Sequence, residues 1–106
     1  MAVEIGVQTF YHFINGKWEP SVNGETFDVL NPATGELVAR VAKGTAEDVD
    51  RAVKAARDAY DQGDWKNMKP GDRANVLNLI AYQITEHAEE LIFLEAVSSG
   101  GTVRRI

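Results

Sequence analysis

The feature that most constrains the fold is a change of hydrophobic period near Gly44. Before it, residues 10–43 carry short runs of alternating apolar and polar residues, separated by turn-forming residues. After it, apolar residues in 45–100 recur every three or four positions, which is the spacing of one helix face. The sequence therefore predicts an α+β fold, with a small antiparallel β-meander followed by two or three helices.

The turns of the first half are marked by residues that tolerate unusual backbone angles. Asn15-Gly16 is the strongest hairpin signal, because both residues accept the positive φ of a type I′ turn. A second turn is expected at residues 22–25. Strands are then expected at 26–30 and 36–41, with a break at 31–35, where Asn, Pro and Gly interrupt the pattern.

The helical half has start and stop signals of its own. Thr45 is a suitable N-cap, and Gly63 ends the first helix. Pro70 suits the first turn of the next helix. We expect a bend or break at His87 and an end at Gly100-Gly101.

The first of these helices should be amphipathic. Glu47–Arg51 and Asp50–Lys54 are spaced as ion pairs on its solvent side. Its apolar stripe comprises Val49, Ala52, Val53, Ala56, Ala59 and Tyr60.

Charge and composition exclude several classes of function. The net charge is -5 and there is no extended basic run, which argues against a nucleic-acid partner. Cysteine is absent, so the chain has no disulfide, thiolate ligand or cysteine nucleophile. No apolar run is long enough to cross a bilayer, and the first residues do not resemble a secretory signal. We expect residues 1–106 to form a single partial domain in the cytoplasm, without a membrane partner.

Several short motifs, taken in order, resemble the start of the aldehyde dehydrogenase superfamily. Each motif is weak alone, but their order and spacing are specific. The matching stretches are FINGKW at 13–18, FDVLNPATGE at 27–36, VAKGTAEDVDRAV at 41–53, Trp65, and residues 73–95.

The resemblance implies an NAD(P)-dependent oxidation of an aldehyde to a carboxylic acid. In such enzymes a cysteine forms a thiohemiacetal and a glutamate activates the hydrolytic water. This segment resembles an outer part of their cofactor-binding half. The sequence has no cysteine and no glycine-rich turn between a strand and a helix. We therefore expect no catalytic residue, no cofactor-binding residue, and no NAD or NADP bound by this chain alone.

One incomplete metal site is implied by the same resemblance. Many relatives bind a structural monovalent cation through backbone carbonyls in the strand before the Asn-Pro turn. Aligned on residues 27–32, those carbonyls belong to Val29 and Leu30. Hard cations need a fuller oxygen shell, so the remaining ligands would come from elsewhere in the parent subunit.

Two clusters of titratable groups have both a functional and a structural interpretation, and the structural one is favoured. Glu86, His87 and Glu90 share a helix face and could bind a metal ion, but they fit a solvated helix junction better. His12 has no second ligand nearby in the sequence and is expected to be structural. The acidic group of Asp58, Asp61 and Asp64 is interpreted as a solvated helix end.

Several aromatic and hydroxyl side chains also have both a functional and a structural interpretation. Trp18, Trp65 and Tyr60 could stack a ligand, but we favour a small aromatic core joining the meander to the first helix. Ser98 and Ser99 have no candidate base in the sequence, so a catalytic triad is not expected.

The expected partner is the remainder of an aldehyde dehydrogenase subunit. The alternatives are a free-standing interaction module without enzymatic activity, and an unrelated α+β scaffold. One helix face should normally pack on elements of that remainder, so we expect the isolated chain to self-associate. That face carries Val76, Leu77, Ile80, Ile84 and Leu91.

Overall fold

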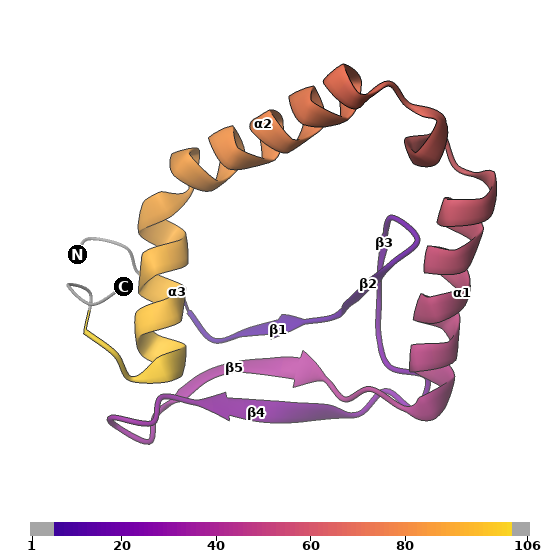
Figure 1. Ribbon diagram of the computed structural model, residues 1–106. Coiled ribbons are helices and arrows are strands. Elements are labelled where there is room, and N and C mark those ends of the chain that lie inside the picture. The colour runs from indigo at the N-terminus through magenta and orange to yellow at the C-terminus, as the bar shows by residue number, and fades with distance from the viewer. Residues whose placement is uncertain (1–5, 103–106) are drawn as a thin grey trace.

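The computed structural model describes residues 6–102. Within these residues, five strands precede three α-helices and a short 3₁₀-helix, which confirms the predicted α+β class and its order of elements (Figure 1). The strands are β1 (Gln8–Phe10), β2 (His12–Ile14), β3 (Lys17–Glu19), β4 (Thr26–Leu30) and β5 (Leu37–Ala42). The helices are α1 (Ala46–Gln62), the 3₁₀-helix η1 (Trp65–Asn67), α2 (Pro70–Glu86) and α3 (Ala88–Ser99).

The strands form a three-stranded sheet in the order β1-β5-β4 and a separate β2–β3 hairpin. β4 and β5 are antiparallel, as are β2 and β3, in agreement with the predicted meander. β1 differs, because it pairs with β5 in parallel, from Gln8 opposite Ala39 to Phe10 opposite Val41. It was missed because it is short and its partner lies some thirty residues along the chain, so local spacing carries no sign of the pairing.

The predicted turns and helix ends are confirmed. Asn15 and Gly16 have φ of 53° and 75° between β2 and β3, as a type I′ turn requires. Pro70 stands at the start of α2, and α2 gives way to α3 at His87. Gly100 ends α3 at a φ of 74°, with its N–H donating to the Ala96 carbonyl at 2.9 Å.

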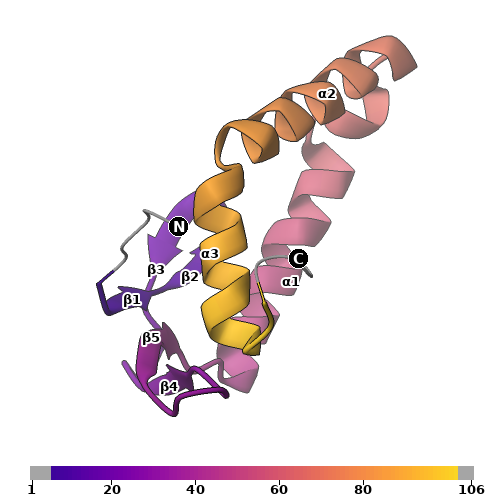
Figure 2. The ribbon, with the colours of Figure 1, turned by 90° about the vertical axis from the view of Figure 1, so that its left-hand side faces the viewer.

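The elements make an open frame. In Figure 1, α1 and α3 stand near opposite ends of the sheet, and α2 spans the distance between them. Figure 2 shows α2 projecting well beyond the strands. The radius of gyration is 17.2 Å, whereas a compact chain of this length has about 13 Å. The frame is therefore far more open than a self-sufficient domain.

The core is correspondingly small. Within residues 6–102, the only buried hydrophobic residues are Ala39 and Ala42, both on β5. Val49 and Val53, from the expected apolar stripe of α1, are more than half exposed. Within the same range, no helix is long and apolar enough to cross a membrane.

The expected aromatic core is not formed. Trp18, Tyr60 and Trp65 keep 68%, 61% and 45% of their surface exposed. Trp18 instead packs on Phe13 across the hairpin, with ring centroids 4.7 Å apart. The cationic groups of Arg57 and Lys66 each lie 5.4 Å from the centroid of the Tyr60 ring. The prediction was wrong because the open frame leaves no enclosed space between hairpin and helix.

Candidate functional site

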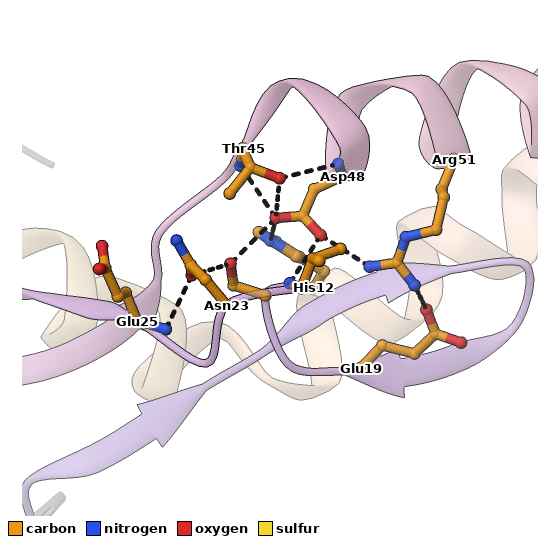
Figure 3. A network of polar contacts seen from close by, with 9 residues as sticks. His12, Glu19, Asn23, Glu25, Thr45, Asp48 and Arg51 are labelled. Atoms are coloured by element: carbon orange, nitrogen blue, oxygen red, sulfur yellow. Dashed lines mark hydrogen bonds and ion pairs between the residues drawn. The ribbon is translucent and has the colours of Figure 1, made fainter.

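The densest polar cluster of the described chain surrounds Asp48, in the first turn of α1 (Figure 3). Its side chain is only 3% exposed. Oδ2 accepts hydrogen bonds from the Thr45 backbone N–H at 2.9 Å and from the hydroxyls of Thr45 and Ser21 at 3.1 Å each. Oδ1 accepts from the Val22 N–H at 3.1 Å and from Arg51 Nη2 at 2.7 Å. The carboxylate therefore ties the start of α1 to the turn that precedes β4.

Arg51 extends this cluster to the hairpin. It lies one turn after Asp48 on α1, and its Nη1 donates to Glu19 Oε2, on β3, at 2.7 Å. The guanidinium thus bridges two carboxylates from different elements, which fixes the distance between hairpin and helix. Hydrogen bonding to Asp48 raises the pKa of Arg51 above its ordinary value, although burial opposes this.

Two opposing effects set the ionisation of Asp48. Burial by itself raises the pKa of Asp48, because it disfavours the charged form. Hydrogen bonds from Thr45, Arg51, Val22 and Ser21 outweigh burial and hold that pKa well below its usual range. The side chain therefore stays ionised through the physiological pH range.

His12 lies against the same carboxylate. Its Nε2 is 3.4 Å from Asp48 Oδ2, and the ring is mostly buried. That nitrogen is enclosed, and no hydrogen bond to it forms within the described residues. The structure thus brings His12 to the polar cluster from β2, in the structural role expected for it.

The arrangement is suited to anchoring rather than to catalysis. A carboxylate offers about four acceptor positions, and four donors of its neighbours already bond to Asp48. The Ser21 hydroxyl is a further contact, whose single proton is shared with Asn23. It has no free lone pair with which to accept a proton from a substrate. The cluster holds α1, the hairpin and the turn before β4 in one fixed relation.

Sequence reasoning did not identify the central position of Asp48. The signal that could have found it is the Thr-x-x-Asp spacing, which is a variant of the capping box. The expected pairs Glu47–Arg51 and Asp50–Lys54 were wrong. Arg51 pairs with Asp48 and Glu19, and Lys54 pairs with Asp58 at 2.9 Å. For Arg51 the reason is burial, because the buried carboxylate of Asp48 attracts a cation more strongly than the exposed Glu47.

The second feature is an apolar groove along α2 and the start of α3. It is lined by Val76, Leu79, Ile80, Gln83, Ile84, His87, Glu90 and Leu91. Ile80, Ile84 and Leu91 belong to the face expected to pack on another element, and each is roughly half exposed. Within the described residues, nothing covers this groove.

The other titratable candidates form pairs on the surfaces of the helices. His87 Nδ1 lies 3.7 Å from Glu90 Oε2 on the exposed helix junction. In residues 6–102, no three acidic or histidine side chains gather as a metal site. Asp58 and Asp61 form ion pairs with Lys54 and Arg57, one helical turn earlier.

The hydroxyls of the two candidate serines donate hydrogen bonds within α3, the helix that carries them. Ser98 Oγ donates to the Leu94 carbonyl, and Ser99 Oγ donates to the Glu95 carbonyl, each at 2.6 Å. Each hydroxyl thus bonds back to the preceding turn of α3. Bonding back to the preceding turn is a common structural geometry for a serine within a helix.

Val29 and Leu30 lie at an irregular point of the sheet. The register between β4 and β5 shifts between them, from Val29 opposite Ala39 to Leu30 opposite Leu37. Consecutive residues of β4 thus pair with Ala39 and Leu37, so the residue left without a partner at this bulge is Val38, on β5.

A family profile described as "Aldehyde dehydrogenase family" matches residues 18–106. The chain belongs to the aldehyde dehydrogenase family. A mitochondrial aldehyde dehydrogenase of Arabidopsis thaliana, family 2 member B4, is 48% identical over 87 residues. That alignment covers 82% of this chain and 16% of the relative.

Solved structures of aldehyde dehydrogenases have the same arrangement of elements. A Bacillus cereus aldehyde dehydrogenase in complex with NAD+ is 43% identical, with a TM-score of 0.80 over 84% of this chain and 18% of that one. An NAD-dependent aldehyde dehydrogenase from Sinorhizobium meliloti has a TM-score of 0.90 at 30% identity, covering 93% of this chain and 20% of that one. The chain thus corresponds to an amino-terminal segment and spans about a fifth of the length of these relatives.

Proposed function

We propose that this chain is the amino-terminal scaffold of an NAD(P)-dependent aldehyde dehydrogenase subunit. It shapes the outer part of the cofactor-binding half and packs against the rest of the subunit. The catalytic cysteine, the glutamate and the cofactor loop are contributed by that remainder, and the chain by itself is inactive. The apolar groove on α2 and α3 is the observation that carries the proposal.

The exposed area supports a partner of large size. The chain exposes 8205 Å², about 2,300 Å² more than a compact protein of this mass exposes. A standard interface between two proteins covers only about 800 Å² on each partner. The uncovered surface is thus of the size that separates two halves of one folded domain.

The distribution of apolar residues on α2 supports the same conclusion. Leu77, Leu79, Ile80, Tyr82 and Ile84 are each more than half exposed, and they extend around much of the helix. A helix with apolar residues on several sides is stable when it is buried on several sides. The sheet of this chain lies across the frame from α2 and does not cover it (Figure 1).

A segment exchange tests the proposal. The matching segment of the Bacillus cereus enzyme, which is 43% identical, is replaced by this chain. We expect a soluble chimera that oxidises an aldehyde with NAD, whereas the same chimera with Ile80→Glu loses solubility or activity. A chimera that tolerates Ile80→Glu as well as it tolerates Asn78→Glu would contradict the role of the groove.

The inactivity of the isolated chain has its own test. Calorimetric titration with NAD should give no measurable heat of binding, and an aldehyde with NAD should give no reduced cofactor. Micromolar affinity for NAD, or turnover by the purified chain, would overturn the proposal.

We also propose that the carbonyls of Val29 and Leu30 contribute to a monovalent cation site of the complete subunit. The family match, which covers residues 18–106, supports it. The segment-exchange chimera should melt at a higher temperature in potassium or sodium chloride than in choline chloride at equal ionic strength. Equal melting temperatures in the three salts would count against the site.

The proposal also covers where the parent enzyme is located and whether the isolated chain self-associates. We place the parent enzyme in the cytoplasm, which fractionation of the source cells would test. The isolated chain should associate with copies of itself, because the groove that the remainder would cover is otherwise left in water.

A further inference from the structure

Two Asn-Gly dipeptides lie in exposed turns of the strand half. Asn15-Gly16 joins β2 to β3, and Asn23-Gly24 precedes β4. In such a pair the glycine nitrogen can attack the asparagine side-chain amide, because glycine has no side chain to hinder the approach. The two pairs are chemically alike, so any difference between them must come from the fold.

Asn23 is held by its surroundings. Its Oδ1 accepts hydrogen bonds from Ser21 Oγ at 2.7 Å and from the Glu25 N–H at 3.0 Å. The Gly24 N–H, which would have to be the nucleophile, donates to the Ser21 carbonyl at 2.9 Å. Figure 3 shows the Asn23 side chain directed into this group of contacts. Both reacting groups are therefore engaged elsewhere.

Asn15 is not held in this way. Within residues 6–102, neither its side-chain amide nor the Gly16 N–H takes part in a hydrogen bond. Strand pairing ends at Ile14 opposite Lys17, so both residues of the dipeptide lie beyond the ladder. The Asn15 side chain and the Gly16 nitrogen can meet without breaking a bond of the hairpin.

We propose that Asn15 is a site of deamidation and isoaspartate formation, and that the fold protects Asn23. The Gly16 nitrogen loses its proton and attacks Asn15 Cγ. The bond from Cγ to Nδ2 breaks, and ammonia leaves with the proton. Water then opens the resulting succinimide at one of its two carbonyls. Attack at Cγ breaks the new bond from Cγ to the Gly16 nitrogen and gives an ordinary aspartate. Attack at the Asn15 main-chain carbonyl breaks the original peptide bond and gives isoaspartate, in which the chain runs through Cγ. The net reaction consumes one water and releases one ammonia.

The product would alter the site described above. The new carboxylate changes the net charge from -5 to -6. An isoaspartyl linkage adds one backbone carbon to a two-residue turn, and the register of a hairpin depends on the length of its turn. That register places Glu19 opposite His12, and Glu19 holds Arg51. Modification of Asn15 therefore loosens the attachment of α1 to the hairpin.

Peptide mapping by mass spectrometry tests the proposal on the full 106-residue chain. The chain is incubated at mildly alkaline pH, once in buffer and once in concentrated urea, and the modified fraction at each asparagine is followed with time. In buffer we expect Asn15 to react about tenfold faster than Asn23, because net-favourable hydrogen bonds at Asn23 must break first. In urea the two rates should become similar.

Ser21→Ala provides a second measurement, because it removes one of the bonds that hold Asn23 Oδ1. We expect it to raise the Asn23 rate relative to the Asn15 rate. Equal rates in buffer, a ratio that is the same in buffer and urea, or a ratio unaffected by Ser21→Ala would each overturn the proposal. None of these outcomes depends on the activity of an assembled enzyme.

Discussion

Thr45 and Asp48 cap each other at the start of α1. The Thr45 hydroxyl accepts the Asp48 backbone N–H at 3.1 Å, and the Asp48 carboxylate accepts the Thr45 backbone N–H at 2.9 Å. Two N–H groups that a helix start would leave unpaired are thereby satisfied. The same carboxylate also binds the turn before β4. Asp48 therefore both caps α1 and attaches that helix to the strands.

Thr45→Ala should destabilise α1. It removes the hydroxyl that accepts the Asp48 N–H, and the loss of an N-cap side chain costs about 1 kcal/mol. The measurement is native-state hydrogen exchange of the α1 amides. Thr85→Ala is the matched control, because the Thr85 hydroxyl bonds only back to the Ala81 carbonyl within α2. Equal protection of α1 in both variants would contradict the cap.

Asp48→Asn should weaken the attachment of α1 to the strands. An amide keeps the shape of the side chain, but its nitrogen cannot accept hydrogen bonds and it does not attract Arg51. We expect α1 to lose protection against hydrogen exchange together with the β2–β3 hairpin. Asp50→Asn, an exposed position on the same helix, should leave both unchanged.

The pH dependence of stability follows from the lowered pKa of Asp48. The folded chain holds this proton more weakly than the unfolded chain, in which an aspartate has a pKa of about 3.9. Its ionisation therefore stabilises the fold above that value, and the contribution is lost as the pH falls towards the folded-state pKa. The helical circular dichroism of the wild-type chain should fall more steeply below about pH 4 than that of Asp48→Asn. An equal loss of helical circular dichroism with falling pH in the wild-type chain and in Asp48→Asn would refute this.

Gly100→Ala should detach the end of α3. Gly100 has a φ of 74°, which costs an alanine about 1 kcal/mol. A Cβ there would also lie 2.8 Å from Pro32 Cγ, in the turn between β4 and β5. Gly71→Ala is the control, because it lies in the first turn of α2 with open space around it. Hydrogen exchange of the α3 amides should increase in the first variant only.

Ile80→Lys should reduce the self-association of the isolated chain. Ile80 lines the apolar groove, and a lysine there cannot be buried without desolvating its charge. Asn78→Lys adds the same charge at an exposed position outside the groove lining. Light scattering at tens of micromolar should show a smaller mean mass for Ile80→Lys than for Asn78→Lys. A wild-type chain that is monomeric at this concentration would contradict the prediction.

The local sequence determined each boundary that depends on a few neighbouring residues. Thr45, Gly63, Pro70 and Gly100 end or begin helices because caps and breakers act within one turn of the chain. Asn15-Gly16 specifies its hairpin for the same reason, since it settles the backbone angles of the turn. The order of the motifs was sufficient to indicate the family, because it reflects the order of these elements.

What depended on distant residues was decided only by the tertiary structure. Nothing near Gln8 in the sequence indicates a parallel pairing with β5. The choice of Asp48 and Glu19 as partners of Arg51 depends on which carboxylates the fold brings within reach and shields from water. The exposure of Trp18 and Val53 has the same origin, because a hydrophobic pattern shows that a residue favours burial and does not provide the surface that buries it.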